Sequence, residues 1–198
     1  SAACALRRMA ESKRIIVGIS GASGAVYGIE LLKALRAAGT ETHLVVSKTA
    51  QITIAHETEY TLPGVHALAD HFYSPQDLSG AIASGSFRAS GMVVAPCSMK
   101  TLAEIATANT STLLTRAADV ILKERRRLVL MARETPLTTA HIRNMLAVSE
   151  MGGIIAPPVP AFYSKPASLQ DMVGHTVGRI LDLFDIEHSL VKRWEGVA

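Results

Sequence analysis

Polar side chains that could bind phosphate and move protons follow each apolar run that this chain would bury as a strand. In chain order they are Ser23, Ser47, Pro96-Cys97-Ser98, Arg133-Glu134 and Tyr163. Because the carboxyl ends of parallel strands meet at one edge of a sheet, we expect these side chains to converge there. Hydroxyl and guanidinium groups bind phosphate oxygens, and a carboxylate can accept or donate a proton. The set predicts a site for a phosphorylated ligand with an acid–base step.

A glycine-rich turn, Ser20-Gly21-Ala22-Ser23-Gly24, follows the first apolar run and leads directly into a helical pattern. Such a turn presents backbone N–H groups at a helix N-terminus, which favours a bound phosphate. The glycines match neither G-x-G-x-x-G nor G-x-x-x-x-G-K-[ST], so dinucleotide and P-loop nucleotide binding are disfavoured. The hydroxyls of Ser20 and Ser23 indicate a mononucleotide such as FMN. A strand-to-helix turn without a ligand is the alternative interpretation.

The elements that must position these groups alternate between short apolar runs and helical patterns. We expect strands at 14–20, 42–47, 91–96, 128–133 and 153–156, and helices at 24–38, 48–58, 98–108, 111–126, 138–151 and 168–184. Continuous apolar runs are typical of parallel strands covered on both faces, and this alternation indicates right-handed crossovers within one sheet. The predicted fold is an α/β domain with a single doubly wound parallel sheet, a flavodoxin-like or Rossmann-like three-layer αβα arrangement.

Composition limits the classes of partner and compartment. The chain has 198 residues, is 48% hydrophobic and 5% aromatic, and carries a formal charge of +3. No apolar run approaches the ~18 residues of a membrane span, and basic residues are not interleaved with aromatic ones, so we expect neither a membrane nor a nucleic acid as partner. The two cysteines, Cys4 and Cys97, indicate no disulfide framework, which favours a reducing cytoplasm. The seven histidines show no ligand spacing such as H-E-x-x-H, so we assign no metal.

A series of motifs makes the chain resemble one family. They are SGASGAVYG, ETHLVVSK, Glu57-Thr58-Glu59, ASGSF, PCSMKTLA, TRAADVILKERR, RETPL and PAFY, in this order. Through them, residues 14–196 resemble the UbiX-type flavin prenyltransferases, formerly described as phenylacrylic or 3-polyprenyl-4-hydroxybenzoate decarboxylases. The resemblance implies a homododecamer that joins a dimethylallyl group from dimethylallyl phosphate to reduced FMN. The prenylated FMN would serve a UbiD-type decarboxylase. We therefore expect two parts in the chain: a flexible N-terminal extension, residues 1–13, and a flavin-binding prenyltransferase domain, residues 14–198.

The resemblance implies a role for each matching residue. The residues expected to hold FMN are Gly21, Ala22, Ser23, Ser47, Ser98, Met99, Lys100, Thr101 and Arg133. Those expected to bind the substrate phosphate are Ser84, Arg116, Lys123, Tyr163 and Arg179, with Arg116 acting from a neighbouring subunit. Those expected to be catalytic are Ser23, Glu57, Glu134, Lys123 and Tyr163. The active site would then be shared between subunits. Alanine-rich helices and a mean hydropathy of +0.26 also favour a closed homo-oligomer.

Other interpretations of the same residues remain. A flavin-dependent cysteine-type decarboxylase could share this fold, although no histidine lies near the first helix to serve as its base. A non-catalytic flavin-binding or delivery module would need none of Glu57, Lys123 and Glu134. A nicotinamide oxidoreductase is disfavoured by the glycine spacing. Arg116, Asp119 and Lys123 could equally form an ion-pair ladder along one helix.

Overall fold

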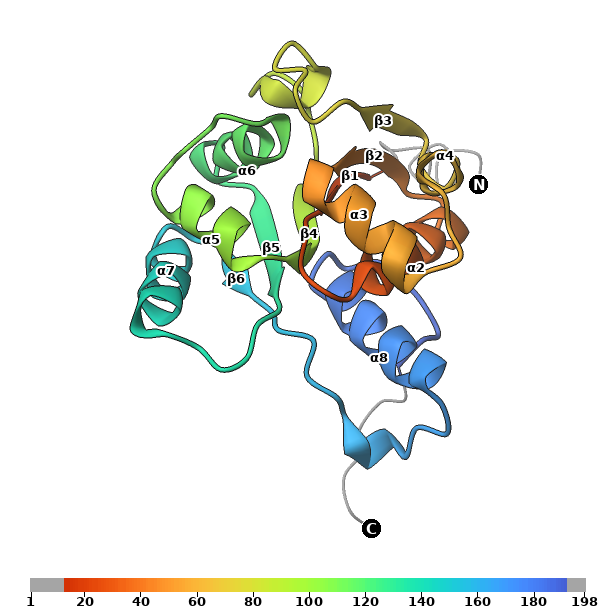
Figure 1. The fold of residues 1–198 in the computed structure, drawn as a ribbon. Helices are drawn as coiled ribbons and strands as arrows, with labels where there is room; N and C mark the ends of the chain where they lie inside the picture. The colour runs from red at the N-terminus through yellow and green to blue at the C-terminus, as the bar shows by residue number, and fades with distance from the viewer. Residues whose placement is uncertain (1–12, 192–198) are drawn as a thin grey trace, which may run out of the picture.

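A single sheet of six parallel strands forms the centre of the protein, in the order β3-β2-β1-β4-β5-β6 (Figure 1). The computed structural model describes residues 13–191. The strands are β1 (Arg14–Ile19), β2 (Glu41–Val46), β3 (His71–Tyr73), β4 (Gly91–Cys97), β5 (Arg127–Ala132) and β6 (Ile154–Ile155). The predicted doubly wound parallel sheet is confirmed.

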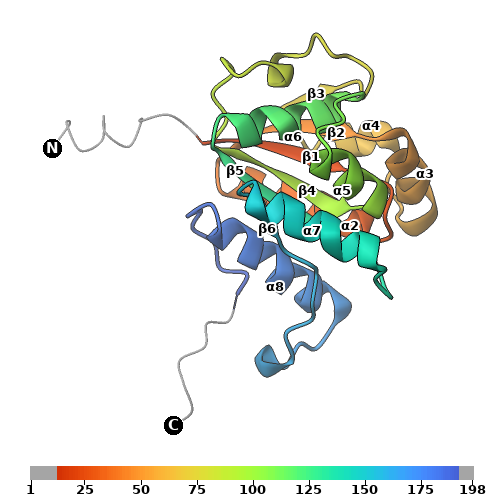
Figure 2. The ribbon, with the colours of Figure 1, turned by 90° about the vertical axis from the view of Figure 1, so that its left-hand side faces the viewer.

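Helices cover both faces of this sheet. They are α2 (Ala25–Ala37), α3 (Lys48–Glu57), α4 (Leu62–His66), α5 (Met99–Ala106), α6 (Leu113–Lys123), α7 (Thr139–Glu150) and α8 (Leu169–Asp182). One core cluster packs α2, α3, α4 and α8 against the sheet, and a second packs α5, α6 and α7 against its other face (Figure 2). Successive strand residues alternate between them, with Ile15 and Val17 in the first cluster and Ile16 in the second. The strands read as unbroken apolar runs because both faces are buried.

The elements missed by the sequence analysis lie between β2 and β4. The strand β3 has only three residues and pairs at the sheet edge, and its Phe72 is exposed. The helix α4 spans a single short segment around Pro63 and Gly64. Neither is long or apolar enough to produce a periodic pattern. Residues 1–12 of the expected extension lie outside the described residues. Between residues 13 and 191, no helix is long and apolar enough to span a membrane.

The strand order reverses between β1 and β4. From β1 the chain adds β2 and β3 on one side, and then returns to add β4, β5 and β6 on the other. Helices that follow neighbouring strands on either side of such a reversal diverge, and open α/β sheets bind ligands in the resulting crevice outside the carboxyl ends of the strands.

Ser20 ties the two strand ends together at this point. Its hydroxyl donates to the carbonyl oxygen of Pro96 at 2.9 Å and accepts from the backbone N–H of Ser98 at 2.8 Å. Its own N–H donates to the Pro96 carbonyl at 3.2 Å. The side chain is buried, so the interpretation of the Ser20 hydroxyl as a ligand contact is wrong. It is a structural bridge between β1 and β4.

Replacing Ser20 should therefore destabilise the fold. Ser20→Ala leaves the N–H of Ser98 buried without its acceptor, which costs about 1–3 kcal/mol of unfolding free energy. Urea unfolding measures this, with Ser149→Ala on the exposed side of α7 as the matched control, expected within about 0.5 kcal/mol of the unaltered protein. Equal stability of the two variants would show that the bridge is unimportant.

Candidate active site

The glycine turn after β1 lies against the start of α3. A Cβ on Gly21 would lie 2.6 Å from Cβ of Thr49, so only glycine allows this approach. Gly24 caps α2 with a φ of 105°, in the left-handed region that favours glycine. Among residues 13–191, the N–H groups of Gly21 and Ala22 find no acceptor, so they remain available to a ligand.

Glu57, at the end of α3, occupies the N-terminus of α2. Its Oε2 accepts hydrogen bonds from the N–H of Gly24 at 2.8 Å and of Ala25 at 3.2 Å. The glycine-rich turn predicted that these donors would be free for a phosphate. Instead a carboxylate of the chain takes them, at the positive end of the helix dipole.

The environment of Glu57 keeps it charged. Burial alone would raise its pKa, but hydrogen bonds from the hydroxyl of Ser23 and the N–H groups of Gly24 and Ala25, together with the charge of Arg133, lower the pKa below its ordinary value. Glu57 is therefore an ionised, fixed carboxylate at neutral pH, and its hydrogen bond orients the Ser23 hydroxyl.

Two further helix N-termini open at the same edge, because each helix follows a parallel strand. Ser47 caps α3 by accepting from the N–H of Ala50 at 3.1 Å, and Ser98 caps α5 by accepting from the N–H of Thr101 at 3.2 Å. The Ser98 hydroxyl also donates to Oγ1 of Thr101 at 3.1 Å. The N-termini of α3 and α5 at this edge create a positive field suited to a phosphate.

The two residues that follow Ser98 in the expected FMN set differ in exposure. Met99 packs partly buried against the second core cluster. Lys100 is exposed, and its Nζ donates to Oε1 of Glu104 at 2.6 Å within α5. Lys100 must therefore leave this ion pair to reach a flavin.

Arg133 and Glu134 complete this edge after β5. The N–H of Arg133 donates to the carbonyl of Cys97 at 3.1 Å, which aligns the ends of β5 and β4. The positive charge of Arg133 lowers the pKa of Glu57 and opposes the burial that raises the pKa of Tyr27. Glu134 is exposed, and its Oε1 accepts from the N–H of Thr135 at 2.9 Å. Cys97 is buried, as expected, and burial raises the pKa of its thiol.

Lys123 and Ser84 lie at the opposite, amino edge of the sheet. Lys123 is the last residue of α6, just before β5 begins, and its Nζ donates to Oε1 of Glu124 at 2.5 Å. Ser84 precedes β4, and its hydroxyl pairs with that of Ser86 at 2.8 Å. A Cβ on Gly85 would lie 2.8 Å from Nζ of Lys123, so the loop that contains Ser84 and Ser86 is in contact with the lysine.

Arg116 and Asp119 form an ion pair, with Nη1 of the arginine 3.3 Å from Oδ2 of the aspartate. This pair belongs to the helical ladder that was the alternative interpretation of these residues. Lys123 does not join it, since it pairs with Glu124. A helical ladder therefore explains Arg116 but not the position of Lys123.

Tyr163 and Arg179 line a cavity of about 430 Å³ between β6 and α8. The Tyr163 hydroxyl lies 3.1 Å from Nε2 of His175, and Arg179 pairs with Asp182 at 2.6 Å. His175 was not among the expected site residues. It is buried and lies one helical turn before Arg179, so the two residues share one face of α8.

The expected phosphate-binding set is thus divided within one chain. Tyr163 and Arg179 lie on the α8 side of the sheet, whereas Lys123 ends a helix on the other side (Figure 2). The structure brings together Ser23, Glu57 and Arg133, but it does not bring Lys123 and Ser84 to them. A single site with all these residues requires a second copy of the chain.

Removing the charge of Glu57 should alter stability in a pH-dependent way. Because the folded pKa lies below the unfolded one, the stabilisation is fully present above about pH 4.3 and is lost as pH falls through the folded pKa. We expect Glu57→Gln to lose about 0.3–1 kcal/mol of unfolding free energy at pH 7, and the two proteins to converge in acid. Urea unfolding at several pH values measures this. Glu59→Gln is the matched control, and a loss with Glu57→Gln that does not change with pH would contradict a charge effect.

The chain is similar to known proteins over nearly its whole length. The family model described as Flavoprotein matches residues 4–193. A probable UbiX-like flavin prenyltransferase of Bacillus subtilis (strain 168) is 57% identical over 184 residues, which cover 93% of this chain and 90% of that protein.

Two crystal structures extend the likeness to three dimensions. AnUbiX in complex with FMN and dimethylallyl pyrophosphate has a TM-score of 0.93 and 53% identity, covering 95% of this chain and 100% of that one. A dodecameric FMN-dependent UbiX-like decarboxylase from Escherichia coli O157:H7 has a TM-score of 0.90 and 53% identity, covering 92% and 100%. With more than half of its residues identical along this length, the chain belongs to the Flavoprotein family and, within it, to the UbiX flavin prenyltransferases.

Proposed function

We propose that this protein joins the dimethylallyl group of dimethylallyl phosphate, or of its pyrophosphate, to reduced FMN. The observation that carries the proposal is the crevice between β1 and β4, where Ser23, Glu57 and Arg133 meet, in a chain so similar to one solved with FMN and dimethylallyl pyrophosphate. Curated relatives 51–57% identical are named as flavin prenyltransferases, so a cysteine-type decarboxylase and a delivery module are not retained as alternatives.

The donors at the carboxyl edge fit a flavin mononucleotide. The N–H groups of Gly21 and Ala22 have no acceptor within the described part of the chain, and the capped N-termini at Ser47 and Ser98 add positive field for the phosphate. Arg133 supplies a cation beside them. The remaining FMN contacts that we propose are Ser23, Met99, Lys100 and Thr101. The reduced flavin ring is electron-rich and receives the dimethylallyl carbon.

Cleavage of the allylic C–O bond sends its electron pair to the departing phosphate and leaves positive charge on the dimethylallyl carbon. Cationic donors must stabilise the phosphate as its charge grows. We assign this role to Lys123, Arg179 and the Tyr163 hydroxyl, with Ser84 and Arg116 beside them. Since Lys123 and Tyr163 lie on different sides of the sheet, the phosphate site is formed by more than one copy.

Ring closure on the flavin also requires a base that takes a carbon-bound proton. Glu57 is poorly suited to this role, because its hydrogen bonds and lowered pKa make it a weak base. They stabilise its ionised form against taking up a proton. Glu134 is exposed just after the end of β5, and only its Oε1 is engaged among the described residues, by the N–H of Thr135. We therefore assign the proton transfer to Glu134 and the orientation of Ser23 to Glu57.

The assembly and the partner enzyme are further parts of the proposal. A dodecamer is supported by the dodecameric relative and by apolar side chains on α7, where Ile142 is 55% and Leu146 57% exposed. Prenylated FMN would then pass to a UbiD-type decarboxylase, as the family resemblance implies. The reducing cytoplasm expected from the cysteine usage stays a prediction.

Anaerobic incubation tests the proposed reaction. The protein is mixed with reduced FMN and with dimethylallyl phosphate or pyrophosphate, and the flavin is analysed by mass spectrometry. We expect the mass of one five-carbon unit to be added to FMN, and the two donors to differ in rate. Unchanged FMN with both donors would contradict the assignment.

Glu134→Gln tests the proposed base in the same assay. It retains the size and hydrogen-bonding capacity of the side chain, but it cannot titrate, so product formation should slow by roughly 10²–10⁴-fold while FMN still binds. The matched control is Glu150→Gln at the end of α7, expected to react at the unaltered rate. A Glu134→Gln protein as fast as the control would remove Glu134 from the mechanism.

A further inference from the structure

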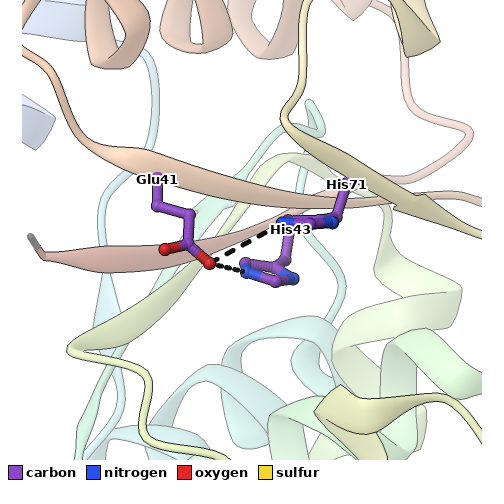
Figure 3. Close-up of side chains that lie close together, drawn as sticks. All are labelled: Glu41, His43 and His71. Carbon is purple, nitrogen blue, oxygen red and sulfur yellow. Dashed lines mark hydrogen bonds and ion pairs between the residues drawn. The ribbon is translucent and has the colours of Figure 1, made fainter.

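Three potential metal ligands meet at the amino edge of β2 and β3, away from the crevice (Figure 3). Glu41 and His43 are two residues apart on β2 and so point to the same face, and His71 is the register partner of His43 on β3. Oε1 of Glu41 lies 2.8 Å from Nε2 of His43 and 3.8 Å from Nε2 of His71. One ligand atom from each residue falls within 4.8 Å of the others.

His43 is held in a fixed orientation. It is 3% exposed, its Nδ1 lies 2.9 Å from the hydroxyl of Tyr73, and its ring centroid lies 4.8 Å from that of Phe87 in an edge-to-face contact. A partner on one imidazole nitrogen fixes which nitrogen is left to bind a metal. With the Tyr73 hydroxyl at Nδ1, that nitrogen is Nε2, which faces Oε1 of Glu41.

Glu41 is likewise oriented. Nε of Arg14 donates to its Oε2 at 3.2 Å, which leaves Oε1 directed at the two histidines. Arg14 is the cation that faces the cluster, and the face of Phe87 lies 5.6 Å from its guanidinium carbon. The arginine holds the carboxylate from the side opposite to the histidines.

We propose that Glu41, His43 and His71 bind one divalent transition-metal ion of the zinc class. Two imidazole nitrogens with one carboxylate oxygen suit Zn²⁺ and its neighbours rather than Mg²⁺ or Ca²⁺, which prefer oxygen ligands. Bonds of about 2.0–2.1 Å in a tetrahedron separate the donors by about 3.3 Å, a value between the 2.8 and 3.8 Å found here.

Binding requires one movement. The ring of His71 now stacks on that of His43, with centroids 4.6 Å apart and planes 18° from parallel, so its nitrogen must turn toward the ion. The side chain of His71 is 56% exposed and is free to rotate. A water molecule would take the fourth position. The ion would join the three-residue edge strand β3 to β2.

The linear sequence hides this cluster. The two residues on β2 give only an E-x-H pattern, and the third ligand arrives 28 residues later through strand pairing. The absence of H-E-x-x-H spacing therefore did not exclude it.

Zinc titration of the untagged, metal-stripped protein tests the site. Calorimetry should give one Zn²⁺ per chain, and thermal unfolding should shift upward with zinc because only the folded chain assembles the ligands. Tyr73→Phe removes the hydroxyl that orients His43 and should weaken zinc binding by about 10–100-fold. His71→Ala removes a ligand and should weaken it by at least about tenfold.

His66→Ala is the matched control, because His66 lies nearby but stacks on Phe72 and takes no part in the cluster. It should bind zinc like the unaltered protein. Since His71 is exposed, the metal-free His71→Ala protein should unfold at the temperature of the metal-free original. Failure of the original protein to bind zinc, or binding that is unchanged in both His71→Ala and Tyr73→Phe, would overturn the proposal.

Discussion

The hydrogen bonds of the Ser20 hydroxyl hold the ends of β1 and β4 at a fixed distance, and the rest of the crevice depends on them. These two strands flank the point where the strand order reverses, so no covalent connection joins them directly there. With their ends fixed, α2 and α5 begin at the same edge on opposite faces of the sheet. Glu57 then reaches the N-terminus of α2 from α3 and fixes the third helix to the same edge.

This architecture separates, within one chain, the residues that we propose as phosphate ligands. A parallel sheet gathers the ends of its strands at one edge and the ends of the preceding helices at the other. Ser23 and Arg133 follow strands, whereas Lys123 ends a helix and Ser84 precedes a strand. Their separation within the chain is a consequence of topology, and a second copy is the direct way to unite them. Apolar side chains left exposed on α7 give such a copy a surface to bury.

The sequence predicted the sheet well because its strands are buried on both faces and its helices are long and periodic. It placed Ser23, Ser47, Ser98 and Arg133 at one edge for the same reason. It could not separate Ser20 from Ser23, since only the return of β4 shows which hydroxyl is buried. Contacts such as Glu57 with Gly24, or His43 with His71, join segments about 30 residues apart and leave no local pattern.

Subunit complementation tests the shared site most directly. Glu134→Gln removes the titrating group at the carboxyl edge, and Lys123→Ala removes the cation at the amino edge. If one site takes these two groups from different copies, a mixed assembly can contain sites in which both groups are intact. With equal, random mixing by co-expression, about one quarter of the sites should be intact and prenylate FMN at the unaltered rate. The control is the two variants purified separately and then mixed without dissociation. A co-assembled sample no more active than this control would show that each site lies within one chain.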